Sequence, residues 1–349
     1  MSFLLMLPLW SDALAGQVRF SGEGHAQNPT WSMDGRYVAF EVNKYDGAGV
    51  DMYVAEVSGD MAAKDAVRVA LPGGGSAFGG SGQVVLNPSW GKEGYVLFEA
   101  SNQGGNFRIY YHRSTGGSPS ELISTSEIPG DLTFPSFSAD AKKIVFVADQ
   151  TGNGDIRVRD VQTSKNIQLT QTNAAEMFPQ FSADGSKILY TRKHDGGEDV
   201  YEIPAEPGGA ETAVAGGSGD QTRPTYAADG FVAYFDGGRG EDHWDLVAIA
   251  NGAKRVLAKD VRLPVRGRPA LSPDGQWLAY TWNDPVKGDR VMLSKVDGSK
   301  TVELPTQFTA CAEPAITQAN GKTVVAFTAL PSSGANWRFL YLMDVTDRL

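Results

Sequence analysis

The stretch that decides the fold reads Asn28-Pro-Thr-Trp-Ser-Met-Asp-Gly-Arg-Tyr-Val-Ala-Phe40. A proline opens a short strand that ends in an acidic-glycine turn, and a stronger, nearly continuous apolar strand follows. Aspartate and glycine suit the tight turn between the two strands. The missing N–H of the proline costs little at the start of a strand. The stretch therefore predicts two consecutive strands joined by a tight turn.

This pattern occurs seven times along the chain, with Asp140-Ala141 and Asn320-Gly321 as variants of the turn. The prolines that open the repeats are Pro29, Pro88, Pro135, Pro179, Pro224, Pro269 and Pro314. Five of the six intervals between them are 44 to 47 residues, and the longer first interval contains a glycine-rich insertion at residues 72–82. Each repeat has room for four short strands, and no segment has a sustained helical period. A period near 45 residues built from short strands is the signature of a propeller blade.

The two ends of the chain predict how the ring closes. The seventh repeat supplies three strands before the chain ends, and residues 17–20 supply a fourth. Pairing of that strand into the last blade would leave no large open sheet edge. We therefore predict an all-β, seven-bladed β-propeller with an N-terminal strand closing the last blade, and a six-bladed ring as the alternative. The predicted blades lie near residues 21–71, 83–124, 125–170, 171–215, 216–258, 259–305 and 306–349 plus 17–20.

Composition and the N-terminal segment limit the classes of function and the cellular locations that we expect for this chain. The 349 residues carry a net charge of −10 with no basic stripe, which argues against a nucleic-acid partner. The single cysteine, Cys311, excludes an internal disulfide. Residues 1–15 are apolar and end in Ala13-Leu-Ala15, which matches a small-x-small cleavage site. We therefore predict a signal peptide at 1–15, one propeller domain at 16–349, and a periplasmic or secreted protein. No other stretch is long enough to span a membrane.

The residues before the seven prolines are the candidate binding residues, because they should begin the innermost strands and ring one mouth of the central channel. They are Asn28, Asn87, Phe134, Phe178, Arg223, Arg268 and Glu313. Arg223 and Arg268, helped by Arg266, would form a basic arc beside two phenylalanines. Such a concavity suits a peptide or a carboxylate. The alternative is that these arginines pair with acids such as Asp220 and Glu313 and only hold the ring together.

Metal binding is the weaker interpretation of the polar loops. Three histidines should lie on the face of the channel mouth: His25, His194 and His243. Imidazole suits manganese, zinc or iron, but nothing in the sequence brings these side chains within ligand distance. A second loop contains Asp149, Asn153 and Asp155, and it lacks the ligand density of a calcium loop. We therefore predict no cofactor, with bound Ca²⁺ or a transition metal as the alternative.

Three of the repeats carry a family resemblance. Residues 28–40, 178–185 and 268–275 resemble the WD40-like repeat of the TolB β-propeller family, and the resemblance extends over about residues 17–349. It implies the propeller fold. TolB itself is periplasmic and binds the peptidoglycan-associated lipoprotein, but it has an additional α/β domain and a six-bladed ring. Similar propellers cap serine peptidases of the prolyl-oligopeptidase and tricorn types. Oligogalacturonate lyases use a seven-bladed propeller with a histidine-bound metal.

Two functions remain open at this point. The sequence has no Gly-x-Ser-x-Gly motif, and we expect the chain to lack the catalytic domain of those peptidases. We predict a non-enzymatic binding or scaffolding module of the cell envelope. Its partner would be an envelope protein or peptide segment, with a lipoprotein as one candidate. The alternative is a metal-dependent propeller enzyme, of the lyase or lactonase type, that acts on a sugar acid.

Overall fold

The chain is all-β, as predicted. The computed structural model describes residues 15–44, 49–72, 82–101, 105–238 and 243–349. They form 28 strands and three short 3-10 helices: η1 (Lys92–Gly94), η2 (Ala228–Gly230) and η3 (Thr346–Arg348). Nearly all of the predicted signal peptide and most of the glycine-rich insertion lie outside the described residues.

Antiparallel pairing arranges the first strands in groups of four. Group 1 contains β2 (His25–Trp31), β3 (Tyr37–Lys44), β4 (Gly49–Glu56) and β5 (Val67–Val69). Group 2 contains β6 (Val84–Trp90), β7 (Tyr95–Ser101), β8 (Arg108–Arg113) and β9 (Ser120–Glu121). Group 3 contains β10 (Leu132–Phe137), β11 (Lys143–Ala148), β12 (Asp155–Asp160) and β13 (Asn166–Gln168). Group 4 contains β14 (Glu176–Phe181), β15 (Lys187–His194), β16 (Gly197–Pro204) and β17 (Thr212–Ala215).

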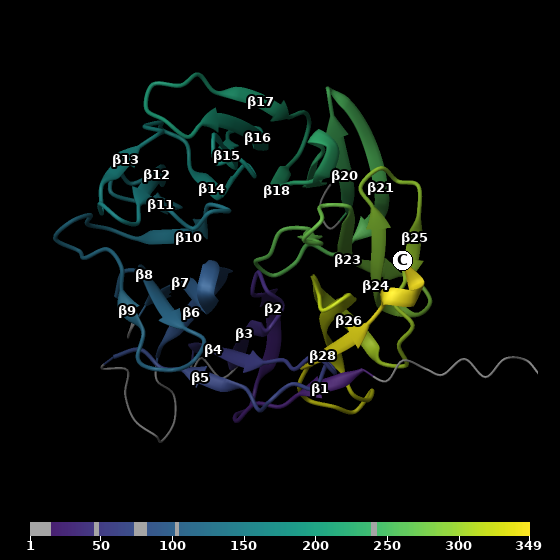
Figure 1. Cartoon of the computed structure of the whole chain (residues 1–349). Helices are drawn as coiled ribbons and strands as arrows, with labels where there is room; N and C mark the ends of the chain where they lie inside the picture. The colour runs from purple at the N-terminus through teal and green to yellow at the C-terminus, as the bar shows by residue number, and fades with distance from the viewer. Residues whose placement is uncertain (1–14, 45–48, 73–81, 102–104, 239–242) are drawn as a thin grey trace, which may run out of the picture.

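The remaining strands form three further groups. Group 5 contains β18 (Gln221–Tyr226), β19 (Val232–Asp236), β20 (Trp244–Ala250) and β21 (Ala253–Val261). Group 6 contains β22 (Ala270–Leu271), β23 (Trp277–Asp284), β24 (Gly288–Lys295) and β25 (Thr301–Glu303). Group 7 contains β26 (Thr309–Ala319), β27 (Lys322–Leu330) and β28 (Phe339–Asp344), together with β1 (Gly16–Val18). Pairing of β4 with β6 joins groups 1 and 2 into one eight-stranded sheet, and pairing of β21 with β23 does the same for groups 5 and 6. The groups follow one another around a common centre, and the first strand of most groups faces that centre (Figure 1).

The N-terminal strand lies beside the last strand of the chain. β1 pairs antiparallel with β28, with Gly16 opposite Leu342 and Val18 opposite Leu340. Val18 is fully buried in a cluster that also contains residues of groups 1 and 7. The Phe20 ring lies 5.5 Å from the Phe40 ring and 5.9 Å from the Phe339 ring. The two ends of the described chain are therefore joined by hydrogen bonds and by apolar packing.

The core lies between neighbouring groups. Each second strand is apolar on both faces because both faces are covered by adjacent groups. Val38, Ala39 and Phe40 of β3, for example, are fully buried. The acidic-glycine turns connect the first and second strands as predicted: Ser32 Oγ donates to Asp34 Oδ1 at 2.6 Å, and Gly35 has a φ of 68°. Glycine adopts this φ at no steric cost.

Candidate functional site

Six of the seven residues before the prolines share an unusual backbone conformation. Their φ angles lie between 47° and 54°, and each sits at a bulge in its strand. These residues are Asn28, Asn87, Phe134, Phe178, Arg223 and Glu313. Positive φ is uncommon for residues other than glycine, and bulges redirect side chains. The prediction that they begin their strands was wrong, because the bulge places them inside the strand.

Five of these six strained positions are held by a hydrogen bond to a neighbouring group, and no such bond to Phe178 is found among the described residues. The Asn87 amide donates to Glu41 Oε1 at 2.9 Å, and the Arg223 amide donates to Thr191 Oγ1 at 3.1 Å. The acceptors occupy the same position in the second strand of the preceding group. Two further contacts of this type join the Phe134 amide to Glu99 and the Glu313 amide to Thr281. The Asn28 amide bonds instead to Glu313, in the first strand of group 7. A buried backbone N–H needs a partner, so these acceptors stabilise the strained conformation.

Group 6 differs from the other groups in its first strand. Its first strand is reduced to two residues, and residues 262–269, which we call the channel segment, form no strand. The segment reaches the common centre of the groups near β2 (Figure 1). The Val265 amide donates to Glu313 Oε1 at 2.8 Å, and Arg223 Nη1 donates to the Gly267 carbonyl at 3.2 Å. Arg268 therefore does not lie in an innermost strand, contrary to the prediction.

A central cavity of about 560 Å³ collects most of the predicted binding residues. Seven of the eight line it: Asn28, Asn87, Phe134, Phe178, Arg266, Arg268 and Glu313. The Phe134 and Phe178 rings lie 4.6 Å apart and form an aromatic wall. Arg223 is the exception, and its guanidinium lies 5.1 Å from the centre of the Phe178 ring. The cavity therefore combines an aromatic surface with arginine side chains.

Two of the three arginines donate hydrogen bonds to backbone carbonyls. Arg223 Nη1 donates to the Pro264 and Gly267 carbonyls, and Arg268 Nη2 donates to the Pro179 carbonyl at 2.7 Å. Burial lowers the pKa of each guanidinium to about 10, and each remains charged at neutral pH. Within the described residues neither forms an ion pair with Asp220 or Glu313. They join groups 4, 5 and 6, although through carbonyls and not through acids.

Arg266 is held differently. Its Nε lies 3.7 Å from Glu41 Oε2, and no hydrogen bond to Nε is present among the described residues. Its side chain is 36% exposed, whereas the Glu41 side chain is fully buried. Arg266 is therefore a loosely held cation in the wall of the cavity.

Two buried glutamates behind the cavity were missed by the sequence analysis. Glu41 accepts hydrogen bonds from Gln27 Nε2 at 2.9 Å, Asn28 Nδ2 at 2.7 Å and the Asn87 amide. Burial raises its pKa, and these hydrogen bonds and Arg266 act in the opposite direction. The signal that could have revealed it is an acid inside an apolar second strand, at Phe40-Glu-Val42.

Glu99 occupies the matching position in group 2. It accepts hydrogen bonds from Asn87 Nδ2 at 2.9 Å and from the Phe134 amide. Burial raises its pKa to about 7; Arg266 opposes this rise and Glu41 adds to it. Burial also raises the pKa of Glu313. Three carboxyl groups therefore have raised pKa values, and Glu41 acts electrostatically on each of the other two.

The three candidate histidines have separate surroundings. His25 Nδ1 accepts from the Arg338 amide at 3.3 Å. His194 Nε2 lies 3.0 Å from Asp199 Oδ2, and His243 Nδ1 lies 3.1 Å from Asp260 Oδ1. In the described part of the chain, no three His, Cys, Asp or Glu side chains are placed to hold a metal ion. The structure does not bring these histidines together.

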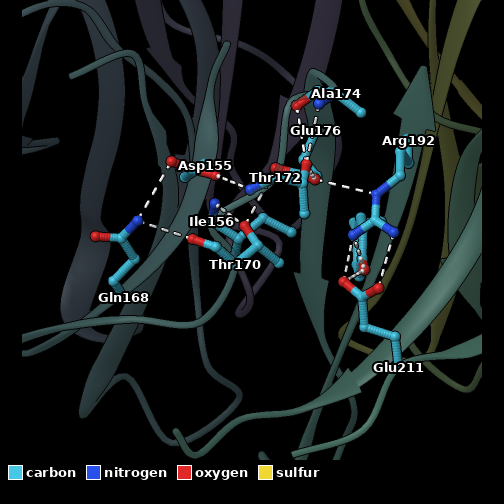
Figure 2. Close-up of polar contacts among 10 residues, drawn as sticks. Asp155, Ile156, Gln168, Thr170, Thr172, Ala174, Glu176, Arg192 and Glu211 are labelled. Atoms are coloured by element: carbon cyan, nitrogen blue, oxygen red, sulfur yellow. Dashed lines mark hydrogen bonds and ion pairs between the residues drawn. The ribbon is translucent and has the colours of Figure 1, made fainter. Parts of the chain in front are cut away.

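The oxygen-rich loop of group 3 is tied to its own protein donors (Figure 2). Asp155 Oδ2 accepts from Thr151 Oγ1 at 2.7 Å and from Gln168 Nε2 at 3.3 Å, and Oδ1 accepts from the Thr172 amide at 3.1 Å. The carboxylate therefore joins β12 to the connection that leads into group 4.

Figure 2 also shows a charge network within group 4. Glu176, whose side chain is fully buried, lies 3.1 Å from Arg192 Nε. Arg192 Nη1 donates to Glu211 Oε2 at 2.8 Å, and Arg192 Nη2 contacts both Glu211 and the Tyr190 hydroxyl. Thr172 Oγ1 donates to Glu176 Oε1 at 2.7 Å. This set, which we call the group 4 network, extends from β14 to the residue before β17.

Comparison with known proteins identifies the family. A family model described as the TolB beta propeller domain matches residues 81–320, which is more than half of the chain. The chain belongs to the TolB β-propeller family. No curated protein sequence matches it. Among the described residues, no helix has the length and apolar character needed to cross a membrane.

Solved structures support the same fold. TolB from Acinetobacter baumannii superposes with a TM-score of 0.60 at 19% identity, over 81% of this chain and 67% of that one. An oligogalacturonate lyase from Vibrio parahaemolyticus gives a TM-score of 0.59 at 13% identity, over 95% and 92%. A puromycin-hydrolyzing peptidase of Mycobacterium tuberculosis gives 0.61 at 14%, over 93% of this chain and 55% of that one. At these identities the likeness shows the fold alone.

Proposed function

We propose that this TolB-family chain is a non-enzymatic binding module of the cell envelope, periplasmic or secreted. It binds a segment of an envelope protein in its central cavity. The observation that carries the proposal is the gathering of an aromatic wall and an arginine-bearing segment around one cavity of about 560 Å³. A cavity of this size accommodates a few side chains of a partner. Aromatic and arginine side chains are the residues most often found at binding hot spots.

The two kinds of arginine contribute differently to binding. Arg223 and Arg268 donate to carbonyls and fix the shape of the wall. Arg266 lines the cavity and is partly exposed, so its guanidinium is free to contact a partner. We therefore place the charge contact of the partner at Arg266 and its apolar contact at Phe134 and Phe178.

A photo-crosslinking experiment tests this function. A photoreactive amino acid at Val265, which is 53% exposed and precedes Arg266, should crosslink a defined envelope protein in native extract. The same group at Val256, 47% exposed on β21, is the matched control. We expect a species from position 265 only, and we expect Arg266→Glu to abolish it. Equal patterns from both positions would contradict the proposal.

The proposal includes a seven-bladed ring in which each group is one blade and β1 closes the last. Its support is the pairing of β1 with β28 and the burial of Val18. A charge at a fully buried position is destabilising by several kcal/mol, which lowers Tm by roughly 10 °C or more. Val18→Asp should therefore melt far below the wild type. Val67→Asp, on β5 and 69% exposed, should not. Equal melting temperatures would refute the closure.

A further inference from the structure

Arg266 lies between two environments that compete for its charge. On one side are Glu41, 3.7 Å away, and Glu99, whose charged form Arg266 also stabilises. On the other side is the central cavity, which Arg266 lines beside the aromatic wall. Because Arg266 Nε has no hydrogen-bond partner among the described residues, the guanidinium is held on the glutamate side by charge attraction and not by a hydrogen bond from Nε.

The surroundings of Glu99 make it depend on this one cation. From β6 it receives the Asn87 side chain, and from β10 it receives the Phe134 amide; both donors are neutral. From β3 it faces Glu41, a like charge, and from the channel segment it faces Arg266. Arg266 is therefore the cation that favours the ionised form of Glu99.

The other arginines that line the cavity already have hydrogen-bond partners in the protein. Arg268 donates to the Pro179 carbonyl, and Arg262 is held by Asp289 Oδ1 at 2.9 Å and by Asn283 Oδ1 at 3.2 Å. Of the described arginines that line the cavity, Arg266 is the one that could donate hydrogen bonds to a ligand without first giving up hydrogen bonds to the protein. Guanidinium groups bind carboxylates with two parallel hydrogen bonds.

We propose that the cavity binds an acidic side chain of the partner segment, and that Arg266 turns from the buried glutamates to this carboxylate while Glu99 takes up a proton. This inference rests on the proposed function, since it specifies the chemistry of the same partner. Arg266 is thus a shared counter-ion, and binding is coupled to protonation.

The sign of the coupling follows from the geometry. When Arg266 pairs with the ligand, Glu99 loses the charge that favours its ionised form, so its pKa in the complex rises above the value of about 7 in the free protein. The complex then holds more protons than the free protein, and affinity increases as pH falls toward 7 from above. A rise of one unit in this pKa corresponds to about a tenfold change in affinity.

Two dipeptides test the coupling directly. Acetylated and amidated Phe-Glu carries the acidic side chain beside an aromatic ring, and Phe-Gln is its neutral counterpart. Calorimetric titration between about pH 6 and pH 8.5, where a peptide glutamate stays ionised, measures affinity. Repeating it in buffers of different ionisation enthalpy measures proton uptake.

We expect Phe-Glu to bind about tenfold more tightly at the lower pH, with uptake of up to one proton, and Phe-Gln to bind more weakly throughout. Glu99→Gln should keep binding and show a smaller pH dependence, since the part that Glu99 contributes is lost and the part due to Glu41 remains. Arg266→Met should lose the preference for Phe-Glu, whereas Arg262→Met should retain it. The carboxyl ¹³C shift of Glu99 should report protonation as Phe-Glu is added.

Three results would overturn the inference: no saturable binding of Phe-Glu, equal binding of Phe-Gln, or a wild-type affinity that does not vary with pH. The proposed function is judged separately, by the crosslink from position 265. If that crosslink persists while the dipeptides behave in one of these ways, the protein is a binding module whose partner chemistry differs. If the crosslink is absent, the binding function itself fails.

Discussion

Two buried glutamate–arginine systems in this molecule use the same residue types and differ in how completely they are paired. In the group 4 network, Glu176 is fully buried and lies 3.1 Å from Arg192 Nε. Behind the central cavity, Glu41 is equally buried and lies 3.7 Å from Arg266 Nε. The arginine side chains are 14% and 36% exposed, respectively.

This difference in pairing distinguishes Arg192, whose charge stabilises the fold, from Arg266, whose charge is able to bind a ligand. All three side-chain nitrogens of Arg192 have partners in Glu176, Glu211 or Tyr190. A buried pair of this kind offsets its desolvation only when the hydrogen bonds are complete. Arg266 Nε has no hydrogen bond, and the glutamates near it are satisfied by neutral donors. Moving Arg266 therefore breaks no hydrogen bond to its Nε, whereas moving Arg192 breaks several.

Removing Arg192 is the strongest test of this distinction. Arg192→Met leaves Glu176 buried without its cation, which should destabilise the fold by about 3 to 5 kcal/mol. Urea denaturation at neutral pH measures the change. Lys142→Met is the control, because its ion pair with Asp140 is 3.7 Å long and mostly exposed, and such pairs contribute about 0 to 1 kcal/mol. Equal effects of the two substitutions would contradict a structural role for the group 4 network.

Glu99→Gln should instead increase the free energy of unfolding. The pKa of Glu99 rises from 4.5 unfolded to about 7 folded, so its charge is destabilising above neutral pH and harmless below about pH 4.5. The variant should therefore gain up to about 3 kcal/mol at pH 8 and nothing at pH 4.5. The free energy of unfolding as a function of pH measures this gain.

The matching change in the group 4 network sharpens the contrast. Burial also raises the pKa of Glu176, and its contacts with Thr172 and Arg192 oppose that rise. Glu176→Gln weakens these contacts, so it should gain less stability at pH 8 than Glu99→Gln does. If Glu176→Gln gains as much stability as Glu99→Gln at this pH, the two systems do not differ in the way described.

The sequence predicted the strands and the gathering of the channel residues for a definite physical reason. A proline, an aromatic or aliphatic residue two positions later and a tight turn set the register of the first strands, so equivalent positions meet at the centre. Phe134 and Phe178, 44 residues apart, come within 4.6 Å in this way. The residues that favour a tight turn are neighbours in the chain, so a single sequence is enough to predict the turn.

The channel segment could not be predicted in the same way. Arg268-Pro269 looks like every other repeat, yet the preceding residues leave the strand. Their conformation is held by Arg223, which donates to carbonyls 41 and 44 residues later in the chain. Long-range contacts of this kind leave no periodic signal. Glu41 and Glu99, in contrast, interrupt apolar strands, and a search for such interruptions would have found them.

The smallest expected effect belongs to Arg266→Met, and its pH dependence is the informative part. Arg266 favours the charged forms of Glu41 and Glu99, so its removal raises their pKa values further. Stability should then fall only where these acids are ionised. We expect a loss below about 1 kcal/mol at pH 8, because Arg266 is partly exposed, and none near pH 5. Arg262→Met, which instead breaks an ion pair with Asp289, should show no such pH dependence. A loss of several kcal/mol at both pH values would mean that Arg266 is as firmly built into the fold as Arg192, and that it is not available to a ligand.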